Sequence, residues 1–275
     1  MTTKSKTKKG NLMKRPAESK ASSSSISKSS GLAETHAGLV FVRRFQNTLA
    51  KNNLLPRGSK IIIAVSGGPD SVALFTILVR LRDKHNFTLR AVHVNYGLRG
   101  RDSDRDEKLV KKLCEEWSVP LSLLHPKKRP KNNIEERLRI IRYRFFERIR
   151  KQYGFNFVVT AHTMNDLAET FLLNLLRGSG MAGLSPFERT HSNLARPLLA
   201  FNRTEIEAFI ETERIHSRVD RSNFSRRFTR NRIRHELLPL LETFNPNIIA
   251  TLRKTTHILS QKYKNTPSAT EGVLG

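Results

Sequence analysis

The sequence predicts an α/β protein in which a doubly wound parallel sheet of five strands carries helices on both faces. From about residue 38, short apolar runs bounded by turn residues alternate with segments of helical periodicity, which is typical of a parallel sheet. The run at residues 61–65 leads through a Ser- and Gly-rich turn into an apolar helix. This succession indicates a Rossmann-like domain that binds an anion at the turn.

The strands are expected at residues 61–65, 89–94, 121–124, 155–160 and, with a weaker pattern, 195–199. The clearest helix covers residues 134–153, because apolar side chains recur there every three or four positions. Those side chains are Ile134, Leu138, Ile141, Phe145 and Ile149. Another helix is expected to open at Thr204, with Glu207 completing a capping box. A last helical stretch covers residues 232–261 and predicts a small C-terminal helical appendage.

Composition divides the chain into four parts. Residues 1–37 are basic and rich in Ser, so they form either a disordered basic arm or an organellar transit segment. The lack of a Leu/Phe stripe favours the arm. We expect the catalytic domain at residues 38–217, an Arg-rich connector with the helical appendage at 218–262, and a disordered tail at 263–275.

The charge of the chain indicates a polyanionic partner. Lys and Arg number 50 against 24 Asp and Glu, a formal net charge of +26, and nucleic acid is the first candidate. A membrane partner is not expected, because no apolar run approaches the ~20 residues of a spanning helix. The protein is therefore expected to be soluble and cytoplasmic, or mitochondrial or plastidial if residues 1–37 are a transit segment. Eight arginines against one acid in residues 214–234 favour contact with an RNA backbone.

The turn after the first strand contains the residues expected to bind a nucleotide: Ser66, Gly67, Gly68, Pro69, Asp70 and Ser71. The two glycines allow close approach of the backbone to a phosphate, and the amides of the following helix point at it. A carboxylate at Asp70 would repel phosphate unless a divalent cation lies between them, so we predict ATP with Mg²⁺. The turn is not a Walker A loop, because it lacks that motif's lysine.

Polar segments also follow other expected strands, at residues 93–100, 160–170 and 177–184. Ligands of a doubly wound sheet bind beyond the carboxyl ends of its strands, so these segments should line one crevice. His93 and His162 each lie close to the end of a strand and either contact the nucleotide or serve as structural histidines. Arg139 and Arg142 lie on the flank of the helix at 134–153 and either bind phosphate or carboxylate or are exposed charges.

At these motifs the chain resembles the tRNA(Ile)-lysidine synthases, which belong to the N-type ATP pyrophosphatases. The similarity runs over residues 60–240, through the Ser-Gly-Gly-Pro-Asp-Ser turn, residues 93–99, 135–143 and 160–184, Asp220-Arg221-Ser222-Asn223, and Arg230-Asn231-Arg232-Ile233-Arg234-His235. The last block is absent from generic ATP pyrophosphatases. Thr163 stands where the family usually has a second His, and Leu167 where it often has Gln.

The resemblance implies the conversion of the wobble cytidine of tRNA(Ile) with a CAU anticodon to lysidine. The C2 oxygen attacks the α-phosphate of ATP, pyrophosphate leaves, and the ε-amine of free L-lysine then displaces AMP. Asp166 and Glu169, three residues apart on one helix face, are expected to bind the ammonium and accept its proton. A homodimer is a further expectation.

The implied site is as follows. The expected catalytic residues are Asp70, which also binds the metal, Asp166, Glu169 and Arg139. The nucleotide is expected to contact the turn from Ser66 to Ser71, together with His93, Arg142 and His162. The expected RNA contacts are Arg99, Arg226, Arg230, Asn231, Arg232 and Arg234.

Two rival functions stay open at the level of sequence. The first is a different tRNA-modifying ATP pyrophosphatase, such as a thiolase that inserts sulfur. Such enzymes usually need a Cys pair or an iron–sulfur cluster, and this chain has only Cys114, on an apolar helix face where a buried role is expected. The second is a catalytically inactive tRNA-binding module, which the changes at Thr163 and Leu167 favour and the acidic residues Asp70, Asp166 and Glu169 oppose.

Overall fold

A computed structural model describes residues 35–126, 133–185, 187, 193–218 and 229–264. By its internal contacts the chain divides into residues 1–32 and residues 33–275, and the described residues all belong to the second unit. The expected basic arm, apart from residues 35–37, lies outside the described residues, as do Asp220, Arg221, Ser222, Asn223, Arg226 and residues 265–275 of the expected tail. No helix within the described ranges is long and apolar enough to cross a membrane.

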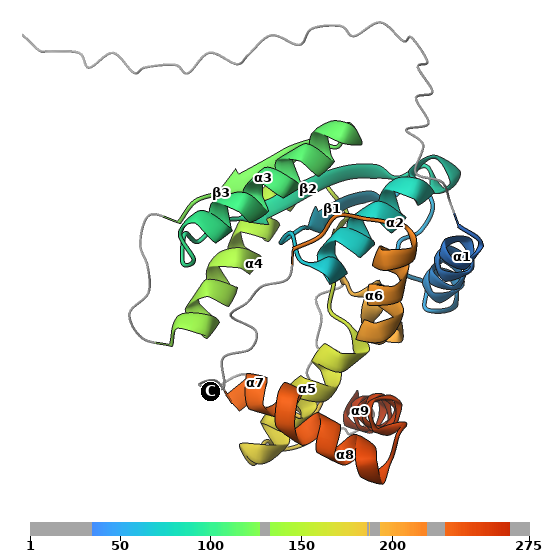
Figure 1. The fold of residues 1–275 in the computed structure, drawn as a ribbon, viewed down its shortest axis with the longest axis vertical. Coiled ribbons are helices and arrows are strands. Elements are labelled where there is room, and N and C mark those ends of the chain that lie inside the picture. The colour runs from blue at the N-terminus through green and yellow to red at the C-terminus, as the bar shows by residue number, and fades with distance from the viewer. Residues whose placement is uncertain (1–34, 127–132, 186, 188–192, 219–228, 265–275) are drawn as a thin grey trace, which may run out of the picture. The chain divides into compact units, whose positions relative to one another are not determined.

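The predicted five-stranded parallel sheet is confirmed (Figure 1). Its strands are β1 (Lys60–Ala64), β2 (Thr88–Val94), β3 (Leu121–Leu124), β4 (Phe157–Val159) and β5 (Leu194–Ala195). They lie in the order β3-β2-β1-β4-β5, and every neighbouring pair is parallel. The chain runs outward from β1 in both directions, so the topological switch point lies between β1 and β4.

Alternation along β1 explains why helices cover both faces. Ile61 and Ile63 are buried with residues of α1 (His36–Lys51), α2 (Pro69–His85), α3 (Arg101–Glu116) and α6 (Arg203–Thr212). Ile62 points to the opposite face, where it is buried with Phe145 and Phe146 of α4 (Ile134–Gln152). The two-residue period of a strand therefore places two separate cores on the sheet.

The C-terminal helices pack on α5 (Met164–Leu176) rather than on the sheet (Figure 1). They are α7 (Thr229–Arg232), a π-helical segment at Ile233–Leu237, α8 (Leu238–Phe244) and α9 (Ile248–Lys264). Phe171 and Leu172 of α5 are buried with Ile233, Leu238 and Leu252 in a third core. Because of this packing, Arg230, Arg232 and Arg234, which together are called the Arg-rich block, lie at the same end of the sheet as the start of α5.

Several expected boundaries are wrong. The fifth strand has two residues, because Pro197 opens a 3₁₀ turn at Pro197–Ala200. The fourth strand covers only Phe157–Val159. The helical stretch expected at 232–261 is confirmed as helical, but it is divided between helices because the chain is extended at Asn245, before Pro246.

The expected capping box at Thr204 is also wrong. The N-cap of α6 is Asn202, whose side chain accepts a hydrogen bond from the Glu205 amide at 2.8 Å. The Glu205 carboxylate accepts one from the Asn202 amide at 2.8 Å in return. Thr204 instead donates its hydroxyl to the Asn202 side chain. Glu207 consequently takes no part in the cap.

Candidate active site

The loop between β1 and α2 is held by hydrogen bonds among its own residues. The Ser71 hydroxyl accepts a hydrogen bond from the Ser66 amide at 3.1 Å and donates one to the Gly68 carbonyl at 2.9 Å. Gly67 has φ +95°, which L side chains rarely adopt, and a Cβ there would lie 3.3 Å from Cβ of Asp106. Because α2 begins at Pro69, its first amides and its dipole face the loop. The loop has the geometry that an anion-binding turn requires.

Asp70 has a buried oxygen, Oδ1, with no hydrogen-bond partner among the described residues. Burial raises the pKa of Asp70 above its ordinary value. The carboxylates of Asp166 and Glu207 act in the same direction as burial, and the guanidinium groups of Arg203 and Arg234 act against it, with a pKa of about 6 as the net result. The described residues contain no group of three His, Cys, Asp or Glu that could hold a metal. A Mg²⁺ ion often takes one protein carboxylate and completes its shell with phosphate oxygens and water, so Asp70 fits that role.

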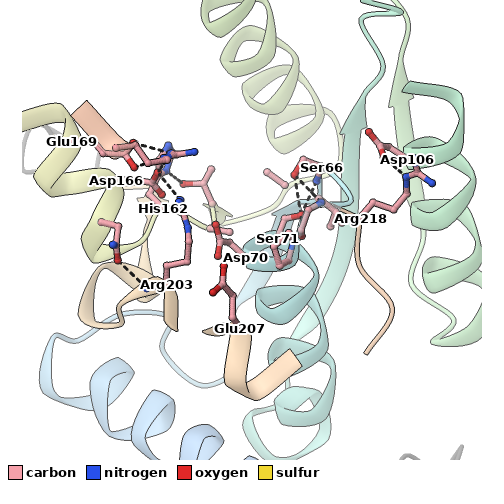
Figure 2. Close-up of a pocket in the computed structure, with 18 of the residues that line it drawn as sticks. Ser66, Asp70, Ser71, Asp106, His162, Asp166, Glu169, Arg203, Glu207 and Arg218 are labelled. Atoms are coloured by element: carbon pink, nitrogen blue, oxygen red, sulfur yellow. Dashed lines mark hydrogen bonds and ion pairs between the residues drawn. The ribbon is translucent and has the colours of Figure 1, made fainter. Parts of the chain in front are cut away.

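A pocket of about 830 Å³ lies beyond the carboxyl ends of β1, β2 and β4 (Figure 2). The candidate phosphate loop, residues 66–71, forms one wall of the pocket. Arg142 of α4 and Arg99, which follows β2, also line the pocket, as do Asp166 and Glu169 of α5. Residues of α6, the π-helical segment and α8 line it as well. This is the switch point of the sheet, where open α/β folds bind their ligands.

The structure brings most of the predicted site residues to this pocket. Those that line it are Ser66, Gly68, Pro69, Asp70, Ser71, Arg99, Arg142, His162, Asp166, Glu169 and Arg234. Those that are described but do not line it are Gly67, His93, Arg139, Arg230, Asn231 and Arg232. Arg99 was expected to contact RNA, yet it lies in the pocket and donates a hydrogen bond to Asp106 at 2.6 Å.

The two predicted histidines have different surroundings. His93 is buried, its Nδ1 lies 2.8 Å from the Val65 carbonyl, and burial lowers its pKa. That position favours the structural alternative. His162 lines the pocket with Nδ1 2.9 Å from the Thr160 hydroxyl. Burial, with Arg196 and Arg142 acting in the same direction, lowers the pKa of His162 well below its ordinary value, so the ring is neutral at pH 7.

Glu169 is fully buried and both of its carboxylate oxygens accept hydrogen bonds from the Arg-rich block. Arg234 donates Nε to Oε1 at 2.6 Å and Nη2 to Oε2 at 2.8 Å, and Arg230 donates Nε to Oε2 at 2.9 Å. Its side chain has 0% exposure, against 14% for Asp166. Residues predicted for two different tasks, lysine binding and RNA binding, are therefore in direct contact.

Asp166 is oriented by the start of α5. The N-cap is Thr163, whose hydroxyl accepts a hydrogen bond from the Asp166 amide, while Oδ2 of Asp166 accepts one from the Thr163 amide at 2.9 Å. Oδ1 lies 3.6 Å from Nη2 of both Arg230 and Arg234 and 3.9 Å from Nη2 of Arg203. Thr163, which departs from the family pattern, thus supplies a cap that fixes this carboxylate.

Four charged residues beside Asp70 and the phosphate loop were not assigned to this pocket from the sequence, although Arg218 belongs to the arginine-rich stretch expected to contact RNA. Glu207 and Arg203 of α6 line the pocket beside Asp70, and Arg218 and Asp106 line it beside the phosphate loop (Figure 2). The sequence predicts a capping box between Thr204 and Glu207. Asn202 and Glu205 have the same three-residue spacing, so the spacing alone does not distinguish the two pairs. Nothing in the sequence relates Asp106 to Arg218, which are 112 positions apart.

The protein is thus an α/β protein in which a loop with anion-binding geometry follows the first strand of a doubly wound sheet and opens into a pocket. The chain belongs to the family of the PP-loop domain, whose model matches residues 39–241.

Curated relatives of this chain are tRNA(Ile)-lysidine synthases. The protein of Caldanaerobacter subterraneus is 35% identical over 80% of this chain and 49% of its own length. That of Clostridium tetani is 36% identical over 76% and 46%, and that of Porphyromonas gingivalis is 38% identical over 77% and 47%. The chain spans about half the length of the curated relatives it matches.

A solved structure shares the fold. The U34-tRNA thiolase of Methanococcus maripaludis, solved with its iron–sulfur cluster, superposes with a TM-score of 0.69 at 19% identity, over 82% of this chain and 80% of the thiolase. At this identity the likeness establishes the fold alone.

Proposed function

We propose that this chain carries the catalytic domain of a tRNA(Ile)-lysidine synthase. It would join free L-lysine to C2 of the wobble cytidine of tRNA(Ile) with a CAU anticodon, releasing AMP and pyrophosphate from ATP. The observation that carries the proposal is the pocket in which the phosphate loop faces Asp166 and Glu169 of α5. The identity to lysidine synthases at 34–38% over about three quarters of the chain supports it.

In the first step the C2 oxygen attacks the α-phosphate and the bond to the bridging oxygen of pyrophosphate breaks. The loop amides and the start of α2 would bind the phosphates. Asp70 is the residue that would hold Mg²⁺, which supplies charge neutralisation at the phosphate oxygens. Arg142, with its side chain in the pocket, would add a bidentate contact to phosphate.

In the second step a neutral amine of lysine attacks C2 and AMP leaves. Free lysine has an amine pKa of ~10.4, so its ammonium must be bound and deprotonated in the site. Asp166 is the better placed carboxylate, because it is partly exposed to the pocket while both oxygens of Glu169 are engaged by guanidinium groups. We therefore assign the ammonium contact and proton acceptance to Asp166, and the positioning of Arg230 and Arg234 to Glu169.

The polyanionic partner would be the tRNA. The net charge of +26 and the cluster of Arg230, Arg232 and Arg234 at the pocket end of the sheet support this. A cytoplasmic location and a homodimer belong to the same proposal.

The test is nucleoside analysis, by mass spectrometry, of tRNA(Ile) incubated with this chain, ATP and lysine. Lysidine that appears only when all three components are present is the expected result. ATP consumption without a need for lysine, or tRNA binding without any AMP formed, would favour the rival enzyme or the inactive module. Sulfur insertion is the weaker rival, because the only cysteine of the sequence, Cys114, is buried on α3 with its pKa raised to about 12.

A further inference from the structure

Two arginines from distant parts of the chain share one carboxylate beside the phosphate loop. Arg99, after β2, donates Nη2 to Oδ2 of Asp106 at 2.6 Å, and Arg218 donates Nε to Oδ1 of the same carboxylate at 2.8 Å. The Asp106 side chain is only 9% exposed, and both arginines line the pocket. Asp106 therefore holds two guanidinium groups at one side of the pocket.

Arg218 and Asp106 also contact the phosphate loop, through a hydrogen bond and through packing. The Arg218 amide donates a hydrogen bond to the Gly67 carbonyl at 3.0 Å, and Asp106 lies against Gly67 so closely that a Cβ there would contact it. Figure 2 shows Arg218 between Ser66 and Ser71 of the loop and Asp106 of α3. The position of the two guanidinium groups is thus fixed relative to the loop amides.

The orientation of Arg218 is fixed as well. Its Nε binds Asp106 and its Nη2 binds Oδ1 of Asp102 at 3.1 Å, so two separate carboxylates hold one edge of the planar group. A guanidinium held in this way loses little freedom when it binds a second anion. Asp70 lies at the other side of the loop, toward α5 and α6 (Figure 2).

We propose that Arg99 and Arg218 bind the terminal phosphates of the nucleotide and the pyrophosphate product, with Asp106 as their positioning residue. This rests on the proposed function, which requires a cleavage between the α- and β-phosphates. When the bond from the C2 oxygen to the α-phosphorus forms, the bond to the bridging oxygen breaks and its electron pair stays on pyrophosphate. Two guanidinium groups beside the loop stabilise that developing charge.

The test measures binding of inorganic pyrophosphate and of AMP to the purified chain by isothermal titration calorimetry. Arg218→Gln and Arg99→Gln should each weaken pyrophosphate binding at least tenfold, because each removes a charge-assisted contact, and should change AMP binding less than threefold. Arg105→Gln is the matched control, since Arg105 also pairs with Asp102 but does not line the pocket. It should leave both affinities unchanged.

The positioning role of Asp106 has its own readout. Asp106→Asn retains both arginines but removes the carboxylate charge that orients them, so it should weaken pyrophosphate binding. The variant should remain folded at 25 °C. Asp106→Glu should restore part of the affinity. Equal weakening of AMP and pyrophosphate in all variants would overturn the proposal, because it would indicate a disturbed loop.

Two further outcomes separate this inference from the proposed function. If the arginine variants lose tRNA affinity and keep pyrophosphate affinity, Arg99 and Arg218 are RNA contacts and the inference fails while lysidine synthesis stands. If wild-type protein binds pyrophosphate through these arginines but forms no lysidine in the nucleoside assay, the inference holds and the proposed function fails.

Discussion

Arg234 binds Glu169 through a bidentate contact, in which Nε donates to Oε1 at 2.6 Å and Nη2 donates to Oε2 at 2.8 Å. The pair joins the π-helical segment to α5 and lies in the wall of the pocket. π-helical turns widen a helix locally and are frequent at functional sites. The pair therefore connects the packing of the C-terminal helices to the geometry of the proposed lysine site.

Replacing Glu169 by Gln should destabilise the protein strongly. The variant leaves Arg230 and Arg234 next to a buried neutral amide, and breaking a buried ion pair costs about 3 kcal/mol or more. Urea denaturation at pH 7 measures the free energy of unfolding. Glu147→Gln on α4 is the control, because the Glu147 side chain is 41% exposed where that of Glu169 is fully buried, so its loss should cost less than about 1 kcal/mol. Equal effects of the two variants would contradict the role assigned to Glu169.

Asp166→Ala should separate the two half-reactions. If Asp166 serves lysine, the variant still transfers AMP to the tRNA, because only the second step needs the amine to be held and deprotonated. ATP labelled at the α-phosphate and gel separation of the tRNA would then show label retained on the RNA, as with wild-type protein deprived of lysine. Absence of labelled RNA would place Asp166 in the adenylation step instead.

Asp70→Asn should abolish AMP formation while leaving tRNA affinity within about twofold. The substitution removes a carboxylate charge that a divalent cation requires and keeps the shape of the side chain. ATP–pyrophosphate exchange in the presence of tRNA is the assay, and loss of metal-mediated stabilisation should reduce it more than 100-fold, about 2.7 kcal/mol. A reduction of tenfold or less would argue against the metal role.

Glu107 should make stability depend on pH in the acidic range. Burial alone would raise the pKa of Glu107, but hydrogen bonds from Lys111, Asn95 and His125 lower it to about 2. A folded-state pKa below the unfolded one means that the stabilisation is complete above about pH 4.5 and is lost as the pH falls toward 2. Glu107→Gln should therefore cost about 3 kcal/mol at pH 7, and roughly 1 kcal/mol less at pH 3.5.

Urea titrations of wild type and variant at both pH values measure that difference. Glu115→Gln, at an exposed position of the same helix, is the control and should show no such change. A penalty that stays constant from pH 7 to pH 3.5 would show that Glu107 acts through packing and not through its charge.

Arg232→Ala should flatten the salt dependence of tRNA binding. Arg232 is 64% exposed and, among the described residues, pairs with Glu236 at the surface, so its substitution leaves the buried contacts of Glu169 intact. One lost phosphate contact reduces the slope of log K against log salt by about 0.7–0.9. Filter binding at a series of salt concentrations gives the slope, and Lys51→Ala at the end of α1 serves as the control. An unchanged slope would remove Arg232 from the RNA-binding surface.

The strands and the phosphate loop could be predicted from the sequence, because each depends on residues that are neighbours in the chain. The apolar run containing Ile61, Ile62 and Ile63 needs only the two-residue period of a strand to bury both of its faces. Gly67 and the start of α2 at Pro69 need only local backbone preferences. The helix expected at 134–153 matches α4 within one residue for the same reason.

The contacts between charged groups could be learned only from the folded chain. Glu169 is 61 and 65 positions from Arg230 and Arg234, and Asp106 is 112 positions from Arg218. Local patterns record which face of an element is apolar, but they do not record how two elements dock. The partners of these carboxylates follow from the packing of Phe171 and Leu172 against Ile233 and Leu238, and from the path of the chain across Gly67. A buried charge requires a partner, and the fold supplies it from whichever segment the apolar contacts bring near.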